Sequence, residues 1–291
     1  MPPQLYPTKP SRYMVIRNVT HNVVTMSLPF ARFGRLKIGA RGTLGSLTPQ
    51  NTNWSYYWPY RLVKMESGSM AVFSPVTLTP EVRDTIEALD GTVKYIAALD
   101  IEHHMHLTPW KEAFPDAEII APEGLWEKRQ SNPDAYKDEK FEHIITKENS
   151  RHKKISDEFD AEFEMEYVYG HPSRELVFVH KPSRTLIEAD LLFNLPAREQ
   201  YSKTPDGPSG ILTKIANTFM SATPPATLHK RFAWYILATA DKQAFIRSIS
   251  RIDQWDFNRL IPCHGDVVES GAKGVFRTVM EWFIDAGKKD I

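Results

Sequence analysis

The sequence predicts an α/β protein in which strands and helices alternate along the chain and pack in layers. Between residues 70 and 120 the pattern changes from strand to helix, to strand, to helix and back to strand at short spacings. This alternation is typical of a layered α/β domain. In addition, each polar segment that carries a suggestive group of histidine or aspartate residues follows a strand-like run. Strand ends are where α/β sheets place functional groups on loops.

The first third of the chain predicts an arm followed by strands. Residues 1–12 are rich in proline and are expected to form an arm with little structure of its own, ahead of a single domain over residues 13–291. Apolar and polar residues alternate over 13–24 and again over 35–39, as they do in half-buried strands.

An aromatic insert then interrupts the pattern at about residues 46–60. It contains Trp54, Tyr56, Tyr57 and Trp58, and four aromatic side chains in five residues rarely all face one core. Three interpretations remain open. The insert is a lid over a pocket, a contact with a partner such as the second copy of a homodimer, or a surface loop fixed by its own aromatic side chains.

The segment that follows carries the predicted alternation of strands and helices. The expected elements are a β-hairpin over 62–65 and 70–73, a helix over 80–89, a strand over 93–99, a helix over 108–114 and a strand over 118–120. Thr79 is the expected N-cap of the first helix, because Pro80 follows it in the first turn and Gly91 stands beyond the end.

The second half of the chain is predicted in the same way. Residues 132–160 are charged and rich in turn formers, so they are expected at the surface. The expected elements after them are a strand over 163–169, a hairpin over 176–179 and 185–187, helices within 206–255, a strand over 260–261 and a helix over 275–284. The residues expected to face the core of the helical part are Ile211, Ile215, Phe219, Phe245 and Ile249.

Composition excludes several classes of protein. Lysine and arginine number 36 and aspartate and glutamate also number 36, so no overall basic charge would attract nucleic acid. Cys263 is the only cysteine, which rules out an intramolecular disulfide and a cysteine-rich zinc site. No stretch approaches the roughly 18 uncharged apolar residues of a spanning helix, and the N-terminus lacks the apolar core of a signal peptide. We therefore expect a soluble cytoplasmic protein that acts on a small molecule, without nucleic-acid or membrane partners.

Three motifs in the second half resemble a known superfamily. They are Gly170-His171, a hairpin over residues 185–193 that contains Asp190, and a Pro-Cys-His-Gly loop that contains His264. In order and spacing they resemble the metallo-β-lactamase superfamily. The resemblance implies an αββα sandwich, in which two mixed β-sheets are flanked by helices, and a metal site on one edge. A run over residues 103–117, which contains His103-His104 and Trp110, is similar to a fungal and bacterial branch of that superfamily with no assigned function.

The first metal motif departs from the superfamily pattern H-x-H-x-D-H. Aligning on Phe114-Pro115 places Glu102-His103 at the Asp-His pair and puts Asp100 and Ala98 at the two preceding histidine positions. One position has therefore lost any donor side chain, and the resemblance implies one well-bound metal ion with a weak or absent second. The implied ligands are Glu102, His103, His171, Asp190 and His264, with Asp100, His104 and His106 as further candidates.

Imidazole and carboxylate ligands suit several divalent metals. We expect one Zn²⁺ ion, with Fe²⁺ or Mn²⁺ as alternatives. A catalytic ion keeps a position for water and lowers the pKa of that water to about 7, which gives a hydroxide nucleophile at neutral pH. Asp190 or Asp100 is the candidate base that orients this water.

Three functions follow from this interpretation. The first is a metal-dependent hydrolase of a small ester, lactone or thioester. The second is a single-metal enzyme with redox or isomerase-type chemistry, and the third is a non-enzymatic binding protein on a degenerate metallo-hydrolase fold.

Overall fold

The computed structural model describes residues 4–46, 68–132 and 140–289. The aromatic insert from residue 47 onward, with Trp54, Tyr56, Tyr57 and Trp58, lies outside the described residues, as does the first strand of the hairpin predicted at 62–65.

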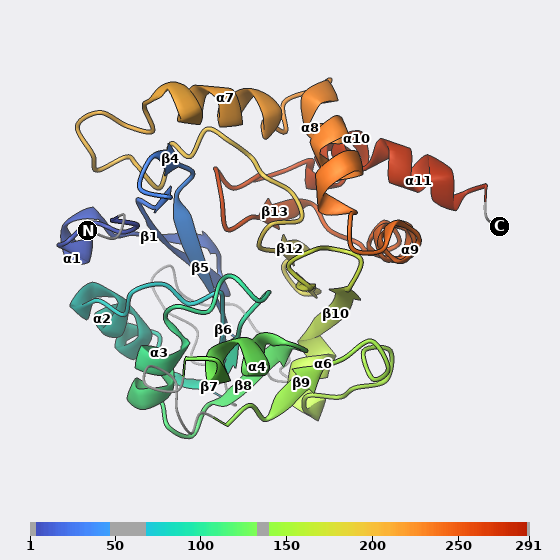
Figure 1. The fold of residues 1–291 in the computed structure, drawn as a ribbon. Helices are drawn as coiled ribbons and strands as arrows, with labels where there is room; N and C mark the ends of the chain where they lie inside the picture. Colours follow the sequence, from blue (N-terminus) through green and yellow to red (C-terminus); the bar gives the residue numbers. More distant parts are fainter. Residues whose placement is uncertain (1–3, 47–67, 133–139, 290–291) are drawn as a thin grey trace, which may run out of the picture.

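Two mixed β-sheets form the centre of the fold (Figure 1). The seven-stranded sheet has the order β1 (Val15–Thr20), β2 (Val23–Leu28), β5 (Ala40–Ser46), β6 (Ser69–Phe73), β7 (Thr92–Ala97), β8 (Glu118–Pro122) and β9 (His143–Ile145). The four-stranded sheet has the order β10 (Phe163–Val168), β11 (Glu175–His180), β12 (Thr185–Ile187) and β13 (Arg259–Ile261). A small separate hairpin joins β3 (Ala31–Arg32) to β4 (Leu36–Lys37).

The helices lie outside the two sheets (Figure 1). They are α1 (Pro10–Tyr13), α2 (Pro80–Ala88), α3 (Leu107–Ala113), α4 (Leu125–Gln130), α6 (Asp157–Glu162), α7 (Ile211–Phe219), α8 (Thr227–Phe232), the π-helix η1 (Ala233–Leu237), α9 (Lys242–Ile252), α10 (Ala272–Val279) and α11 (Glu281–Gly287). Figure 1 shows α2 and α3 beside the seven-stranded sheet, and α8 to α11 beside the four-stranded sheet.

The alternation of side chains along each strand explains why the sheets pack against each other and against the helices. Successive side chains of a strand point to opposite faces. On β6, Phe73 belongs to the core between the sheets, whereas Val72 packs with the residues of α2 and α3. On β11, Phe178 faces Phe73 at a ring-centroid distance of 5.1 Å, whereas Val177 belongs to the core under the C-terminal helices. Each sheet is thus apolar on both faces, and the predicted αββα sandwich is confirmed.

Several predicted elements are confirmed within a few residues. The helix α2 begins after Thr79, whose backbone is extended as an N-cap requires, and β7, α3 and β8 follow in the predicted order. The two strands of the hairpin that precedes Asp190 pair antiparallel as β11 and β12.

Other elements differ from the prediction. The alternation over 13–24 is split into β1 and β2 by a turn, because alternation alone does not show where a strand reverses. The helix predicted over 275–284 is broken at Met280 into α10 and α11. The predicted N-terminal arm, residues 1–12, includes most of the short helix α1, and its Tyr6 ring lies 5.0 Å from that of Phe30.

The apolar face of α7 is also oriented differently. Ile211, Ile215 and Phe219, which were expected in the core, are 80%, 51% and 42% exposed. The buried residues of α7 are Thr213 and Ala216, so the small side chains of the helix face the protein. Phe245 and Ile249 on α9 are fully buried, as predicted.

Candidate metal centre

Four loops meet at one edge of the sandwich because of the strand directions. The strands β12 and β13 are parallel, with Ile187 paired to Ile261, so the loops that carry Asp190 and His264 leave the sheet side by side. The strand β10, which precedes His171, is antiparallel to β11 and therefore runs in the same direction as β12. The loop after β7 reaches the same edge, where the Leu99 carbonyl accepts a hydrogen bond from the Leu176 N–H at 2.6 Å.

Three of the predicted ligands converge there. The Nε2 atom of His103 lies 3.1 Å from the Nε2 atom of His264, and the latter lies 3.3 Å from Asp190 Oδ1. Asp190 and His264 are buried, and His103 is partly buried. One potential ligand atom from each residue lies within 4.8 Å of the other two, which is compatible with a single shared ion. We call His103, Asp190 and His264 the triad.

Hydrogen bonds on the far side of each ring fix which nitrogen faces the triad. The Nδ1 atom of His264 lies 2.6 Å from the Gly39 carbonyl oxygen, which can only accept, so Nδ1 carries the proton. The Nδ1 atom of His103 lies 2.9 Å from both carboxylate oxygens of Asp100 and donates to them. When each ring is neutral, its Nε2 lone pair therefore points into the triad. This second-sphere arrangement orients metal-ligating histidines in proteins.

The ring of His264 is further fixed by stacking. Phe193 lies parallel to it, with an interplanar angle of 3° and centroids 5.7 Å apart, and Phe30 stacks with it at 5.9 Å. Rotation of the imidazole would break both contacts, so its lone pair has one available direction.

The electrostatics of the triad suit a cation. Burial lowers the pKa of His264 to about 4. Burial alone would also lower the pKa of His103, but the nearby carboxylates of Asp100 and Asp190 raise it to about 9. Within the described part of the chain, Asp190 Oδ1 is buried and forms no hydrogen bond. Two imidazole lone pairs and a carboxylate oxygen that face one another repel unless a proton or a metal ion lies among them, so these residues fit a divalent ion.

Backbone N–H groups position Asp190. Glu175 accepts hydrogen bonds from the N–H groups of Ala189 and Asp190 at 2.8 and 3.0 Å. Glu188 accepts from those of Leu191 and Leu192 at 2.9 and 3.1 Å. Burial raises the pKa of both glutamates well above the ordinary value.

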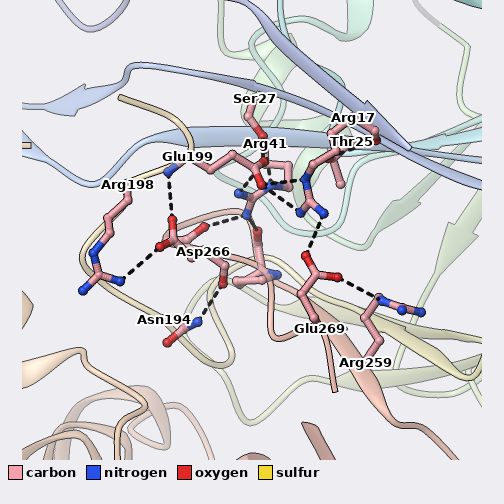
Figure 2. Close-up of polar contacts among 12 residues, drawn as sticks. Arg17, Thr25, Ser27, Arg41, Asn194, Arg198, Glu199, Arg259, Asp266 and Glu269 are labelled. Atoms are coloured by element: carbon pink, nitrogen blue, oxygen red, sulfur yellow. Dashed lines mark hydrogen bonds and ion pairs between the residues drawn. The ribbon is translucent and has the colours of Figure 1, made fainter. Parts of the chain in front are cut away.

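A buried arginine holds the loop that carries His264. The guanidinium of Arg41 donates to the carbonyl oxygens of Pro262 and Gly265, at 2.8 and 2.6 Å, on either side of the histidine. It also donates to Ser27 Oγ and Glu199 Oε1, at 3.0 Å each, and is completely buried (Figure 2). The seven-stranded sheet, through β5, therefore positions a candidate ligand that follows a strand of the other sheet.

Glu199 connects this arginine to a wider network (Figure 2). Its carboxylate accepts from Arg41, from Ser27 at 2.8 Å and from Arg17 at 2.8 Å, and Arg17 also pairs with Glu269. Burial raises the pKa of Glu199, but these partners outweigh it and the net pKa is lowered. The carboxylate is therefore ionised at neutral pH and compensates the buried charge of Arg41.

The carboxylates of Glu102 and Asp100, two other predicted candidates, have partners outside the metal-facing side of the triad. The Glu102 carboxylate, predicted as a ligand, bonds to Lys128 Nζ at 2.7 Å and is 43% exposed, so the structure does not bring it to the triad. The carboxylate of Asp100, a candidate ligand and base, is occupied by the His103 ring and by the N–H groups of residues 102 and 103 at 2.8 and 2.7 Å. Asp100 thus lies behind His103, because a turn of the chain folds its carboxylate back onto the following backbone.

The three remaining histidines have different surroundings. The Nδ1 atom of His104 lies 2.9 Å from the Arg129 guanidinium, away from the triad. His171 is buried near the triad, but its Nδ1 atom accepts from the Ser173 N–H at 3.1 Å. With Nδ1 accepting, the proton of the neutral ring lies on Nε2, which is buried and has no hydrogen-bond partner among the described residues. His106 Nε2 is buried and forms no hydrogen bond within the described residues.

A cavity of about 380 Å³ opens beside the triad. Both histidines of the triad line it, together with Phe30, Val76 and Met105. Tyr6, from the segment predicted as an arm, also lines it and packs edge-on against His106 at 5.1 Å. A concave apolar site with a few convergent polar groups is typical of small-molecule binding.

Sequence reasoning missed four residues that support this site: Tyr6, Arg41, Glu175 and Glu199. Glu188 lies within the recognised hairpin motif, but the other carboxylates and Arg41 stand in unremarkable sequence. Their roles depend on contacts between segments far apart in the chain, such as the 158 residues that separate Arg41 from Glu199.

Comparison with solved structures identifies the fold. The DIM-1 metallo-β-lactamase exposed to ceftazidime aligns over 97% of this chain and all of its own, with a TM-score of 0.52 and 11% identity. A metallo-β-lactamase from Pontibacter korlensis aligns over 93% of this chain and 98% of its own, with a TM-score of 0.54 and 10% identity. The metal-soaked Flv1 flavodiiron core from Synechocystis sp. PCC6803 gives a TM-score of 0.56 and 12% identity over 93% of this chain and 60% of its own. The chain therefore has the metallo-β-lactamase fold, as the sequence resemblance implied.

The particular family is shown by a family model. The model described as "Domain of unknown function (DUF4336)" matches residues 59–227, more than half of the chain, so the protein belongs to this family. No curated protein matches the sequence. Among the helices of the described residues, none has both the length and the apolar character needed to cross a bilayer.

Proposed function

We propose that this protein is a metal-dependent hydrolase that acts on a small ester, lactone or thioester and uses one divalent ion, Zn²⁺. The observation that carries the proposal is the convergence of His103 Nε2, Asp190 Oδ1 and His264 Nε2 beside an apolar cavity that both histidines line. These three residues would hold the ion. When bound, such an ion would polarise a carbonyl group. It would also lower the pKa of a water molecule, so that hydroxide is available as the nucleophile at neutral pH.

The remaining groups prepare the site for that chemistry. Asp100 keeps the proton of His103 on Nδ1, and the Gly39 carbonyl does the same for His264. Asp190 is the proposed proton acceptor, whereas Asp100 is proposed as a positioning residue because its oxygens are already engaged. Burial lowers the pKa of His106 to about 4, so its ring is neutral and can form a hydrogen bond with a substrate oxygen in the cavity.

The proposal of a single ion is supported by the residues at the positions where the superfamily pattern would place ligands for a second metal ion. Ala98, which stands at one expected histidine position, has no donor atom on its side chain. Asp100 is bonded to His103, and His171 has the tautomer described above. A second ion would find no prepared set of ligands among these residues.

An iron enzyme is the second candidate, because of the composition of the triad. Two imidazoles and one carboxylate with open positions also suit Fe²⁺, which supports oxygen chemistry in other proteins. This candidate keeps the same three residues and differs in the metal and in the reaction.

Elemental analysis of the protein purified without a tag or chelator tests both candidates. About one equivalent of zinc in the wild type, lost in His264→Ala, supports the hydrolase and calls for a panel of esters, lactones and thioesters. Iron instead of zinc supports the second candidate. His180→Ala is the matched control, since His180 is equally buried but bonds to Ser183 and Glu162, away from the triad. Metal that persists in His264→Ala, or that is lost equally in the control, contradicts the proposed site.

A further inference from the structure

A second, larger cavity lies beside the metal-site cavity. It is an apolar groove of about 910 Å³ between the β3–β4 hairpin and α7, and Figure 1 shows α7 beside β4 at the top of the molecule. The apolar side chains that define it are Phe33, Leu36, Leu212, Ile215, Phe219 and Phe232. We call this cavity the α7 groove.

The exposure of these side chains follows from how α7 is attached. The Lys37 N–H donates to Thr213 Oγ1 at 3.0 Å, and Lys37 Nζ donates to Ser209 Oγ at 3.1 Å. Polar contacts and the small side chain of Ala216 thus fix the helix to the hairpin, and its large apolar residues are left in the groove. Phe33 is 71% exposed on the opposite side. Exposed apolar side chains that gather in one place mark binding sites.

The groove and the metal-site cavity share two lining residues, Arg32 and Phe33. The smaller cavity is also lined by His264 and by Phe30, which stacks on that histidine. A single extended molecule that occupied both cavities would reach from His264 into the groove.

We propose that the substrate is an acyl ester or thioester with a long unbranched chain, with its carbonyl group at the triad and its chain in the α7 groove. This inference rests on the proposed hydrolase function. Hydrolysis adds water across the C–O or C–S bond, and the products are a carboxylic acid, which ionises, and an alcohol or a thiol. The carboxylate product keeps the acyl chain of the substrate. It therefore has a polar head group for the triad and an apolar chain for the groove. Arg32, whose guanidinium packs on the Phe33 ring at 5.6 Å, lines both cavities and offers a positive charge to that carboxylate.

Equilibrium binding of straight-chain carboxylates tests the groove without turnover. The probes are hexanoate, octanoate, decanoate and dodecanoate, each below its micelle concentration, titrated calorimetrically into the full-length protein with and without added Zn²⁺. Burial of the chain predicts that the affinity rises roughly two- to fourfold for each added CH₂ group. An affinity that does not change with chain length overturns the inference.

Substitutions at two equally exposed isoleucines test where the carboxylate chain binds. Ile215 lines the groove and is 51% exposed, whereas Ile236, on η1 and outside the groove, is 52% exposed. Ile215→Asn is expected to weaken dodecanoate binding about tenfold or more and hexanoate binding much less, and Ile236→Asn to leave both within twofold. Because both side chains are half-exposed, both variants are expected to fold, which circular dichroism verifies. Equal effects of the two substitutions overturn the inference.

Turnover separates this inference from the proposed function. Hydrolysis of short esters together with flat chain-length binding overturns only the acyl-chain assignment. Chain-length-dependent binding that Ile215→Asn abolishes, without hydrolysis of any ester or thioester, supports the groove as an acyl-binding site and overturns the hydrolase. Binding to phosphatidylglycerol vesicles in the absence of carboxylate binding overturns the inference in favour of a membrane surface.

Discussion

At the scale of single residues, the candidate site depends on protons held in fixed places. His103 and His264 each have one nitrogen engaged by an acceptor and the other directed into the triad. The acceptor is a carboxylate for His103 and a backbone carbonyl for His264. Only the carboxylate can be removed by substitution, so Asp100 offers the direct test of this arrangement.

We expect Asp100→Asn to weaken metal binding by about 10- to 100-fold, the usual effect of losing such a supporting carboxylate. The asparagine keeps the shape of the side chain but loses the charge that stabilises the His103 ring. Competition with a chelator of known affinity measures the change. Asp116→Asn, an exposed residue beyond α3, is the control. An unchanged affinity in Asp100→Asn would show that the carboxylate does not act through His103.

The substitution Glu102→Gln tests whether Glu102 is a metal ligand, as the sequence resemblance implied, or an exposed partner of Lys128, as the structure shows. If Glu102 were a ligand, its replacement would reduce the metal content. Because its carboxylate instead forms an exposed pair with Lys128, we expect the metal content to stay the same and the free energy of unfolding to change by about 1 kcal/mol or less. Elemental analysis and urea denaturation check the two statements. Loss of the ion would restore Glu102 to the ligand set.

At the scale of elements, the loop after β13 is held by its neighbours as well as by its own sequence. Arg41 on β5 binds the carbonyl groups on both sides of His264, and Glu199 balances the charge of that arginine. Replacing one partner of a buried pair leaves the other uncompensated, which is more damaging than the loss of an exposed pair. The position of His264 therefore depends on Arg41 and Glu199, which lie in two other segments of the chain.

The lowered pKa of Glu199 predicts how stability depends on pH. A carboxyl group whose pKa is lower in the folded state contributes stability above its unfolded pKa of about 4.3. This contribution is lost as the pH falls through the folded pKa. The wild type should therefore lose more stability between pH 6 and pH 3 than Glu199→Gln does, and the two should converge in acid.

Urea midpoints measured across that range test this prediction, with Glu112→Gln as an exposed control. Parallel curves for the wild type and Glu199→Gln would show that the Arg41–Glu199 pair does not contribute in this way.

At the scale of the whole molecule, the triad joins the two sheets. His103 follows β7 of the seven-stranded sheet, whereas Asp190 and His264 follow strands of the four-stranded sheet. An ion bound by all three would link the two halves of the sandwich across their edge. We therefore expect metal binding to be coupled to folding stability, because the unfolded chain does not assemble the three candidate ligands.

We expect added Zn²⁺ to raise the melting temperature of the wild type but not that of His103→Ala or His264→Ala. At a free concentration 100 times the dissociation constant, the stabilisation is about 2.7 kcal/mol. Differential scanning calorimetry of the chelator-treated protein measures the shift, and Mn²⁺ and Fe²⁺ are compared in the same way. An equal shift in the wild type and both variants would place the ion elsewhere.

The sequence by itself determined the order of the elements, the fold class and the strand ends at which His171, Asp190 and His264 stand. These features are local: hydrophobic period, cap residues and short motifs leave their signal within a few neighbouring residues. The sequence also indicated that the first motif is degenerate, since Ala98 has no donor. The tertiary structure decided which of the predicted ligands meet.

The structure placed Glu102 on Lys128, folded Asp100 behind His103 and brought Arg41 to the His264 loop. It also decided that α7 exposes its large apolar residues, because periodicity shows which side chains share a face of a helix but not what that face contacts. These outcomes depend on the packing of segments that are distant in the chain, and no local pattern encodes such contacts.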